Sequence, residues 1–97
     1  MDEIYNLSSQ VVLEAFDDSA LVLRLKDRHL FELNQTAREI LIRTSGQLSV
    51  GQIAVEIAQI YQLNASEACQ DVLTLCEYLL DEGIIKREKY IQNRKEG

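Results

Sequence analysis

The stretch HLFELNQTAREIL, residues 29–41, contains the point at which the chain changes from strand to helix. Residues 29–33 are rich in leucine and phenylalanine and predict a short strand. Asn34 is a favoured residue at a helix start, because its side chain can accept a hydrogen bond from the first turn. Apolar residues then recur at helical spacing, through about Thr44: Ala37, Ile40 and Leu41. We therefore expect a strand that leads directly into a helix.

Two further strands are predicted upstream of this stretch. Residues 11–16 form a mostly apolar run that ends at the turn-forming residues 17–19. In the next segment, leucines alternate with other residues, which places three of them on one face of the strand: Leu21, Leu23 and Leu25. This alternation is the pattern of a half-buried antiparallel strand. The three strands together predict a meander.

Two more helices are predicted downstream, each with its own start signal. Residues 49–52, SVGQ, form a capping-box pattern for a helix that continues to about residue 61. Residues 64–67, NASE, repeat the pattern for a helix that ends near residue 82, where Gly83 suits the left-handed closing position. The expected fold class is α+β: a three-stranded antiparallel sheet followed by three helices, in the outline of a winged helix-turn-helix domain.

The length and composition are those of one small globular domain. The chain has 97 residues, of which 46% are apolar and 27% charged. We expect the folded domain at residues 1–85 and a basic C-terminal tail at residues 86–97, where five basic side chains accompany two acidic ones. No apolar run approaches the roughly 18 residues that span a bilayer, and the N-terminal residues do not resemble a signal peptide. We expect a cytoplasmic protein that does not bind membranes.

The charge pattern argues against nucleic-acid binding. The net charge is −6, and no Lys or Arg occurs between Thr44 and Ile85. In a helix-turn-helix protein the third helix would enter the DNA groove, but here its charged residues are all acidic. Because phosphate recognition depends on Lys and Arg, we expect no nucleic-acid partner.

No motif of a catalytic centre is present. The chain has no glycine-rich phosphate loop, and its one histidine, His29, begins a predicted strand. Cys69 and Cys76 are seven positions apart. In a helix this spacing puts them about 10.5 Å apart, beyond the reach of a disulfide. We interpret both as apolar residues, and we expect no catalytic residue, no metal site and no cofactor.

The third helix is apolar over an unusually wide arc. Its first stripe consists of Ala68, Val72, Leu75 and Leu79. Its second stripe consists of Cys69, Leu73, Cys76 and Leu80. Together the stripes cover about 160°, whereas a surface helix needs little more than about 100°. Either both stripes are core, or part of the second lines an exposed groove beside the last strand, where a partner peptide could dock.

The segment LNQTA, residues 33–37, resembles the L-N-x-T-A signature of the PqqD family, which is named after a pyrroloquinoline-quinone (PQQ) biosynthesis protein. Further matches follow in order over residues 10–85: Ile40-Leu41, Gly46, Asp71-Val72 and Leu79…Gly83-Ile84-Ile85. The chain departs from the family where it has Lys26-Asp27 in place of a frequent Pro-Glu, and Ser45-Gly46 in place of Asp-Gly.

The resemblance implies a peptide chaperone without catalytic activity, a recognition element for ribosomally made, post-translationally modified peptides. Such proteins bind the leader segment of a precursor peptide and present it to a modifying enzyme, often a radical-SAM protein. The leader adds as a strand beside the third strand, in a cleft bordered by the third helix. The peptide-binding residues expected here are His29, Leu30, Phe31, Glu32, Leu33, Cys69, Leu73, Cys76 and Leu80.

A second interpretation is an assembly module that binds no leader peptide. Its edge strand or groove would serve self-association, for example as a strand-swapped dimer, or docking to a partner enzyme. We expect a monomer or a weak homodimer if the first interpretation holds.

Overall fold

The computed structural model describes residues 2–88, which form six strands and three helices. In chain order these are β1 (Ile4–Leu7), β2 (Val11–Ala15), β3 (Ala20–Arg24), β4 (His29–Leu33), α1 (Gln35–Leu41), β5 (Ser45–Ser49), α2 (Val50–Tyr61), α3 (Ala65–Asp81) and β6 (Ile85–Arg87). The strands form two antiparallel sheets, with the orders β2-β3-β4 and β5-β1-β6. The α+β class predicted from the sequence is confirmed.

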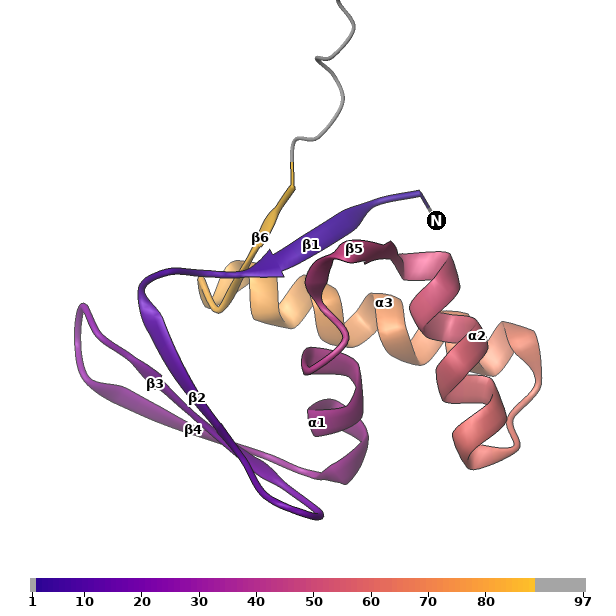
Figure 1. The fold of residues 1–97 in the computed structure, drawn as a ribbon, viewed down its shortest axis with the longest axis horizontal. Helices are drawn as coiled ribbons and strands as arrows, with labels where there is room; N and C mark the ends of the chain where they lie inside the picture. Colours follow the sequence, from indigo (N-terminus) through magenta and orange to yellow (C-terminus); the bar gives the residue numbers. More distant parts are fainter. Residues whose placement is uncertain (1, 89–97) are drawn as a thin grey trace, which may run out of the picture.

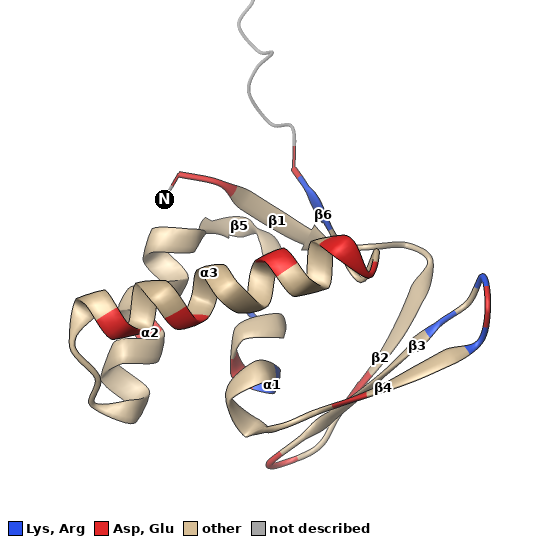
Figure 2. Ribbon diagram, turned by 180° about the vertical axis from the view of Figure 1, so that it is seen from behind, with Lys and Arg blue, Asp and Glu red and all other residues tan. Residues whose placement is uncertain are grey.

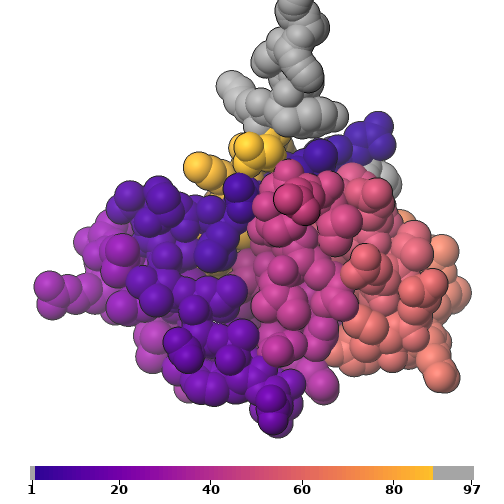
Figure 3. Space-filling model, viewed as in Figure 1, coloured from indigo at the N-terminus to yellow at the C-terminus, as the bar shows by residue number. Residues whose placement is uncertain are grey.

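The sheet β2-β3-β4 is the meander expected from the sequence. β2 pairs with β3 along its whole length, and β3 pairs with β4 from Ala20 opposite Leu33 to Arg24 opposite His29. Figure 1 shows this sheet at one end of the molecule and α2 at the other, with α1 between them. In the space-filling view of Figure 3, the same strands (indigo to violet) form one side of the visible face and the helices the other.

The second sheet was absent from the sequence-based prediction, so the expectation of a single sheet is wrong. β1 lies in its middle and pairs with β5 on one side and β6 on the other. In β6, Ile85 lies opposite Leu7 and Arg87 opposite Tyr5, which joins the two ends of the described chain. Residues 86 and 87 of the predicted tail therefore belong to a strand. Residue 88 follows this strand, and residues 89–97 of the predicted tail lie outside the described residues.

The helices begin at the predicted capping residues, and α3 also ends as predicted. Ser49 Oγ accepts a hydrogen bond from Gln52 N at 3.2 Å, and the Gln52 side-chain oxygen accepts one from Ser49 N at 2.8 Å. Asn64 caps α3 through its side-chain oxygen. Gly83 has a φ of +73°, and the next residue donates its N–H to Leu79 O at 2.9 Å. This is the helix closure that the sequence predicted.

The core-facing side of β3 is the opposite of the one that the leucine pattern predicted. Ala20 and Val22 are 1% and 0% exposed, whereas Leu21 and Leu23 are half-buried and Leu25 is 45% exposed. α1 packs against β3 and β4 on the inner face. Ala20 and Val22 of β3 therefore lie on the face that α1 covers, and the leucines lie on the outer face.

A hydrophobic core joins the sheets and the helices. Its largest fully buried side chains belong to Ile40, Leu41, Ile53, Ile57, Leu79 and Ile84. None of the helices within residues 2–88 combines the length and the apolar character that a membrane span requires.

Candidate functional site

A cavity of about 510 Å³ opens between β4, α1 and α3. These three elements are seen together in Figure 2, and we call the cavity the β4–α3 groove. It is lined by Glu32, Leu33, Asn34, Thr36, Ala37, Ile40, Asp71, Thr74, Leu75 and Tyr78. Its size lies within the range of about 300–1,000 Å³ that is usual for ligand sites.

The groove combines buried apolar side chains with an exposed polar rim. β4 and α1 contribute three buried apolar residues: Leu33, Ala37 and Ile40. From α3, Leu75 is half-buried and the Tyr78 ring is 44% exposed. Glu32 and Asp71 are the acidic residues of the lining, and among residues 2–88 no Lys or Arg lines the groove. Such a surface can hold apolar side chains under a rim that favours positive charge.

β4 is an edge strand among residues 2–88, because a neighbouring strand, β3, lies on one side only. The hydrogen bonds at the ends of β3 show which backbone groups face that edge. Phe16 N donates to Ser19 O, and Leu25 N donates to Gln10 O, both at 2.9 Å. In an antiparallel pair, successive residues bond to alternate sides. The odd-numbered residues of β3 therefore bond to β2, and its even-numbered residues bond to β4.

The even-numbered residues of β3 lie opposite the odd-numbered residues of β4. It follows that the backbone N–H and C=O groups of Leu30 and Glu32 point to the open edge. Phe31 and Leu33 turn their side chains inward, where both are buried, whereas Leu30 is 54% exposed on the outer face. An extended peptide strand beside the groove could form hydrogen bonds with these four backbone groups, which β3 does not use.

Arg24 joins the end of this sheet to the end of α3. Its Nη1 donates to the carbonyl oxygen and to Oε1 of Glu82, at 2.6 and 2.9 Å. Its Nε and Nη2 donate to the two carboxylate oxygens of Asp27, at 3.0 and 2.8 Å. These hydrogen bonds lower the pKa of the Asp27 carboxyl group to about 2. The turn between β3 and β4 is thereby held against α3, which fixes the two walls of the groove relative to each other.

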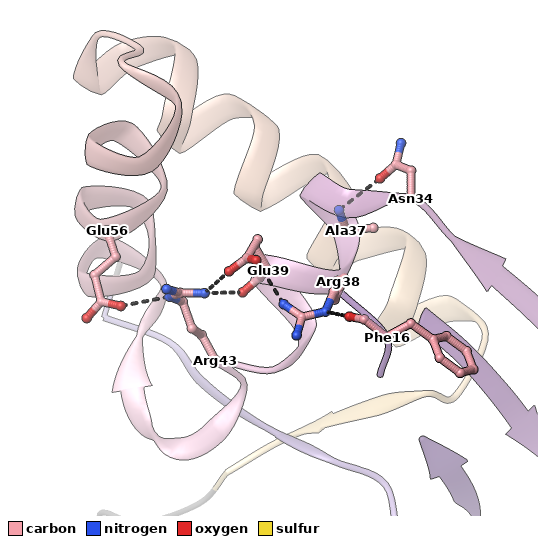
Figure 4. Close-up of polar contacts among 7 residues, drawn as sticks. All are labelled: Phe16, Asn34, Ala37, Arg38, Glu39, Arg43 and Glu56. Atoms are coloured by element: carbon pink, nitrogen blue, oxygen red, sulfur yellow. Dashed lines mark hydrogen bonds and ion pairs between the residues drawn. The ribbon is translucent and has the colours of Figure 1, made fainter. Parts of the chain in front are cut away.

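A second set of polar contacts fixes the other end of the groove (Figure 4). Asn34 follows β4 directly, and its Oδ1 accepts a backbone N–H from the first turn of α1 at 2.9 Å. Arg38 of α1 donates from Nε to the carbonyl oxygen of Phe16 at the end of β2. Arg43 donates from Nε to Glu56 of α2 at 2.7 Å. These contacts hold α1 between the sheet and α2.

The structure brings part of the predicted site together at the groove. β4 spans His29–Leu33, the residues expected from the sequence. Glu32 and Leu33 line the groove, and Leu30 lies beside it on the outer face. Phe31 is core: it is 6% exposed, and its ring centroid lies 4.5 Å from that of His29.

The residues predicted on α3 lie elsewhere, and none of the four lines the groove. Cys76 is 1% exposed in the core, and burial raises the pKa of its thiol to about 11. Cys69 lines a smaller apolar cavity of about 220 Å³ between α2 and α3. Leu73 and Leu80 are partly buried against the core. The structure therefore places Cys76 in the core and Cys69 against α2. A role of these four residues in peptide binding stays a prediction.

The α3 wall is formed instead by Asp71, Thr74, Leu75 and Tyr78. These residues lie on the other side of the buried positions of α3, so periodicity alone left three of them on a polar face. The sequence held one signal for this wall, which is Tyr78, a large aromatic side chain among charged neighbours. Figure 2 shows that the charged residues of α3 are all acidic.

These features define a small α+β domain with an open strand edge beside a helix-lined groove. The family model described as "Coenzyme PQQ synthesis protein D (PqqD)" matches residues 19–85. The chain belongs to the PqqD family, as the LNQTA segment predicted. No curated protein matches the chain.

Two solved structures share the fold. "TbiB1 in Complex with the TbiA(beta) Leader Peptide" has a TM-score of 0.76 and 20% identity, and the match covers 90% of this chain and 99% of that one. "Lasso peptide synthetase B1 complexed with the leader peptide" has a TM-score of 0.76 and 21% identity, with 84% and 96% of the two chains covered. The likeness confirms the fold over nearly the whole length of both neighbours.

Proposed function

We propose that this chain binds the leader segment of a precursor peptide as a strand added to β4, with alternate side chains in the β4–α3 groove. It then presents the peptide to a modifying enzyme, for which the PqqD family favours a radical-SAM protein. The chain carries out no chemistry itself and acts in the cytoplasm. Its α2–α3 pair is the helix-turn-helix of a winged helix-turn-helix domain that serves peptide recognition instead of DNA binding.

One observation carries the proposal: the outward-facing backbone groups of Leu30 and Glu32 lie directly beside an apolar groove. Strand addition uses such an edge for affinity and adjacent pockets for specificity. The two similar structures are both complexes with leader peptides, which supports the same use here.

The expected affinity is modest. Four backbone hydrogen bonds contribute about 1 kcal/mol each, and two buried apolar side chains about 1.5–3 kcal/mol each. Association costs at least about 4 kcal/mol. The dissociation constant is then on the order of tens of micromolar or weaker, which suits a protein that must release its peptide to an enzyme.

The test is a titration of the chain with a fluorescein-labelled leader segment of a candidate precursor peptide, followed by fluorescence anisotropy. Tyr78→Ala removes the exposed ring at the rim of the groove, and Ile60→Ala is the matched control, because the two side chains are 44% and 46% exposed. We expect saturable binding that Tyr78→Ala weakens about fivefold or more and that Ile60→Ala leaves unchanged. The absence of saturable binding, or an equal loss in both variants, would contradict the proposal.

The open edge also suits the assembly module considered above, because Val12 and Leu30 are 51% and 54% exposed on the outer face of the same sheet. Sedimentation equilibrium at several protein concentrations separates the two functions. A monomer that binds the leader supports peptide presentation. A stable dimer that covers residues 29–33 and excludes the leader would favour the assembly module instead.

A further inference from the structure

The outer face of the sheet β2-β3-β4 carries two rows of side chains that end at the open edge. In the first row, cross-strand neighbours are Val12, Leu23 and Leu30. In the second row they are Glu14, Leu21 and Glu32. A strand added to β4 extends both rows by one residue, because opposite residues of neighbouring strands project from the same face.

The first row is apolar and incomplete at its edge. Val12 and Leu30 are 51% and 54% exposed, and Leu23 between them is half-buried. An apolar side chain placed beside Leu30 would remove more of this surface from water, which is favourable. The position opposite Leu30 therefore selects an apolar residue.

The second row carries two carboxylates without a positive partner. Within residues 2–88, neither Glu14 nor Glu32 takes part in an ion pair or a side-chain hydrogen bond. Leu21 between them offers no counter-charge. Opposite charges stabilise a cross-strand pair, and like charges destabilise it. The position opposite Glu32 therefore selects Lys or Arg and disfavours Asp and Glu.

The adjacent peptide position, opposite Leu33, projects from the inner face. Leu33 lines the β4–α3 groove together with Leu75 and Tyr78 of the facing helix. A side chain at this position enters the groove and can contact the apolar groups of these three residues.

We infer that the bound peptide is recognised by a three-position pattern: an apolar residue opposite Leu33, a Lys or Arg opposite Glu32 and an apolar residue opposite Leu30. The basic residue is thus adjacent to one apolar residue and two positions from the other, in either strand direction. This inference rests on the proposed function and narrows its substrate class to extended peptides that carry this pattern.

The experiment is a selection of dodecapeptides from a random phage-displayed library on three proteins: the unchanged chain, Glu32→Lys and Glu77→Lys. Glu77 is an exposed residue of α3 that does not line the groove, so its variant makes the same change in net charge away from the site. We expect pools with the predicted spacing, with Lys or Arg for the unchanged chain and Glu77→Lys, and with Asp or Glu for Glu32→Lys. A selected peptide should bind Glu32→Lys about fivefold more weakly than the unchanged chain.

The possible failures are distinguishable. Pools with alternating apolar residues but with the same charge preference on all three proteins would overturn the recognition pattern and leave strand addition intact. Selected peptides that bind without protecting the Leu30 and Glu32 amides from hydrogen exchange would contradict the proposed function itself, as would the absence of any enriched peptide.

Discussion

Replacement of Leu30 by proline tests the outward direction of a single backbone N–H. The register places this N–H at the open edge, so proline removes no hydrogen bond from the β3–β4 ladder. Proline is tolerated in edge strands when its ring faces outward. Loss of one backbone hydrogen bond to the leader costs about 0.5–1.5 kcal/mol, which corresponds to a rise in dissociation constant of about 2- to 12-fold.

Two variants separate the backbone effect from others. Leu30→Ala removes the same side chain but keeps the N–H, so the ratio of the two dissociation constants, measured by anisotropy, reports the N–H alone. Phe31→Pro removes an N–H that faces β3 and a ring that is 6% exposed, and we expect it to cost about 3 kcal/mol or more of unfolding free energy. The reasoning is refuted if Leu30→Pro unfolds as readily as Phe31→Pro, or if Leu30→Pro and Leu30→Ala bind the leader equally well.

Three further predictions concern the scaffold. Because the pKa of Asp27 is lowered, its carboxylate stabilises the fold at pH values above its ordinary pKa of 3.8, and this contribution is lost as the pH falls toward about 2. In thermal melts, Asp27→Asn should therefore be less stable than the unchanged chain at pH 7, and the difference should shrink in acid. Cys76 should resist Ellman's reagent at pH 8 until the protein unfolds, because its thiol is buried with a pKa of about 11. The partly exposed Cys69 should react in the native state. Equal reaction rates for the two thiols would contradict the packing of α3. Leu73→Glu should lower the unfolding free energy by about 1–3 kcal/mol without changing the leader affinity of the folded fraction. A loss of leader affinity without a loss of stability would instead show that Leu73 contacts the peptide.

The local elements were predictable because their signals lie in short stretches of sequence. Asn34, Ser49 and Asn64 each accept a hydrogen bond from the first turn of the helix that follows. Gly83 closes α3 in the left-handed conformation. In each case a side chain or a glycine acts on backbone within a few positions, so no knowledge of distant contacts is needed.

The second sheet was not predictable because its pairing is distant in sequence. β6 has three residues and β1 has four. They pair although about 80 residues of sequence separate them, for example Tyr5 from Arg87. β5, with the sequence SGQLS, shows no apolar alternation. Such strands are formed by tertiary context, which overrides weak local preference.

The facing of β3 and the facing of α3 depend on the same physical factor. Periodicity shows which residues share a side of a strand or helix, but it does not show which neighbour covers that side. Leu21 and Leu23 of β3 lie outside because α1 packs against the opposite face. On α3, Cys76 is buried in the core, and the residues around Tyr78 line the groove.

Amide hydrogen exchange, resolved by residue in NMR spectra, tests the open edge most directly. In the free protein we predict fast exchange for the Leu30 and Glu32 amides and slow exchange for Phe31 and Leu33, whose N–H groups bond to β3. Saturation with the leader peptide should slow Leu30 and Glu32 selectively. Protection of these two amides in the free chain, or their continued fast exchange when the peptide is bound, would contradict strand addition at β4.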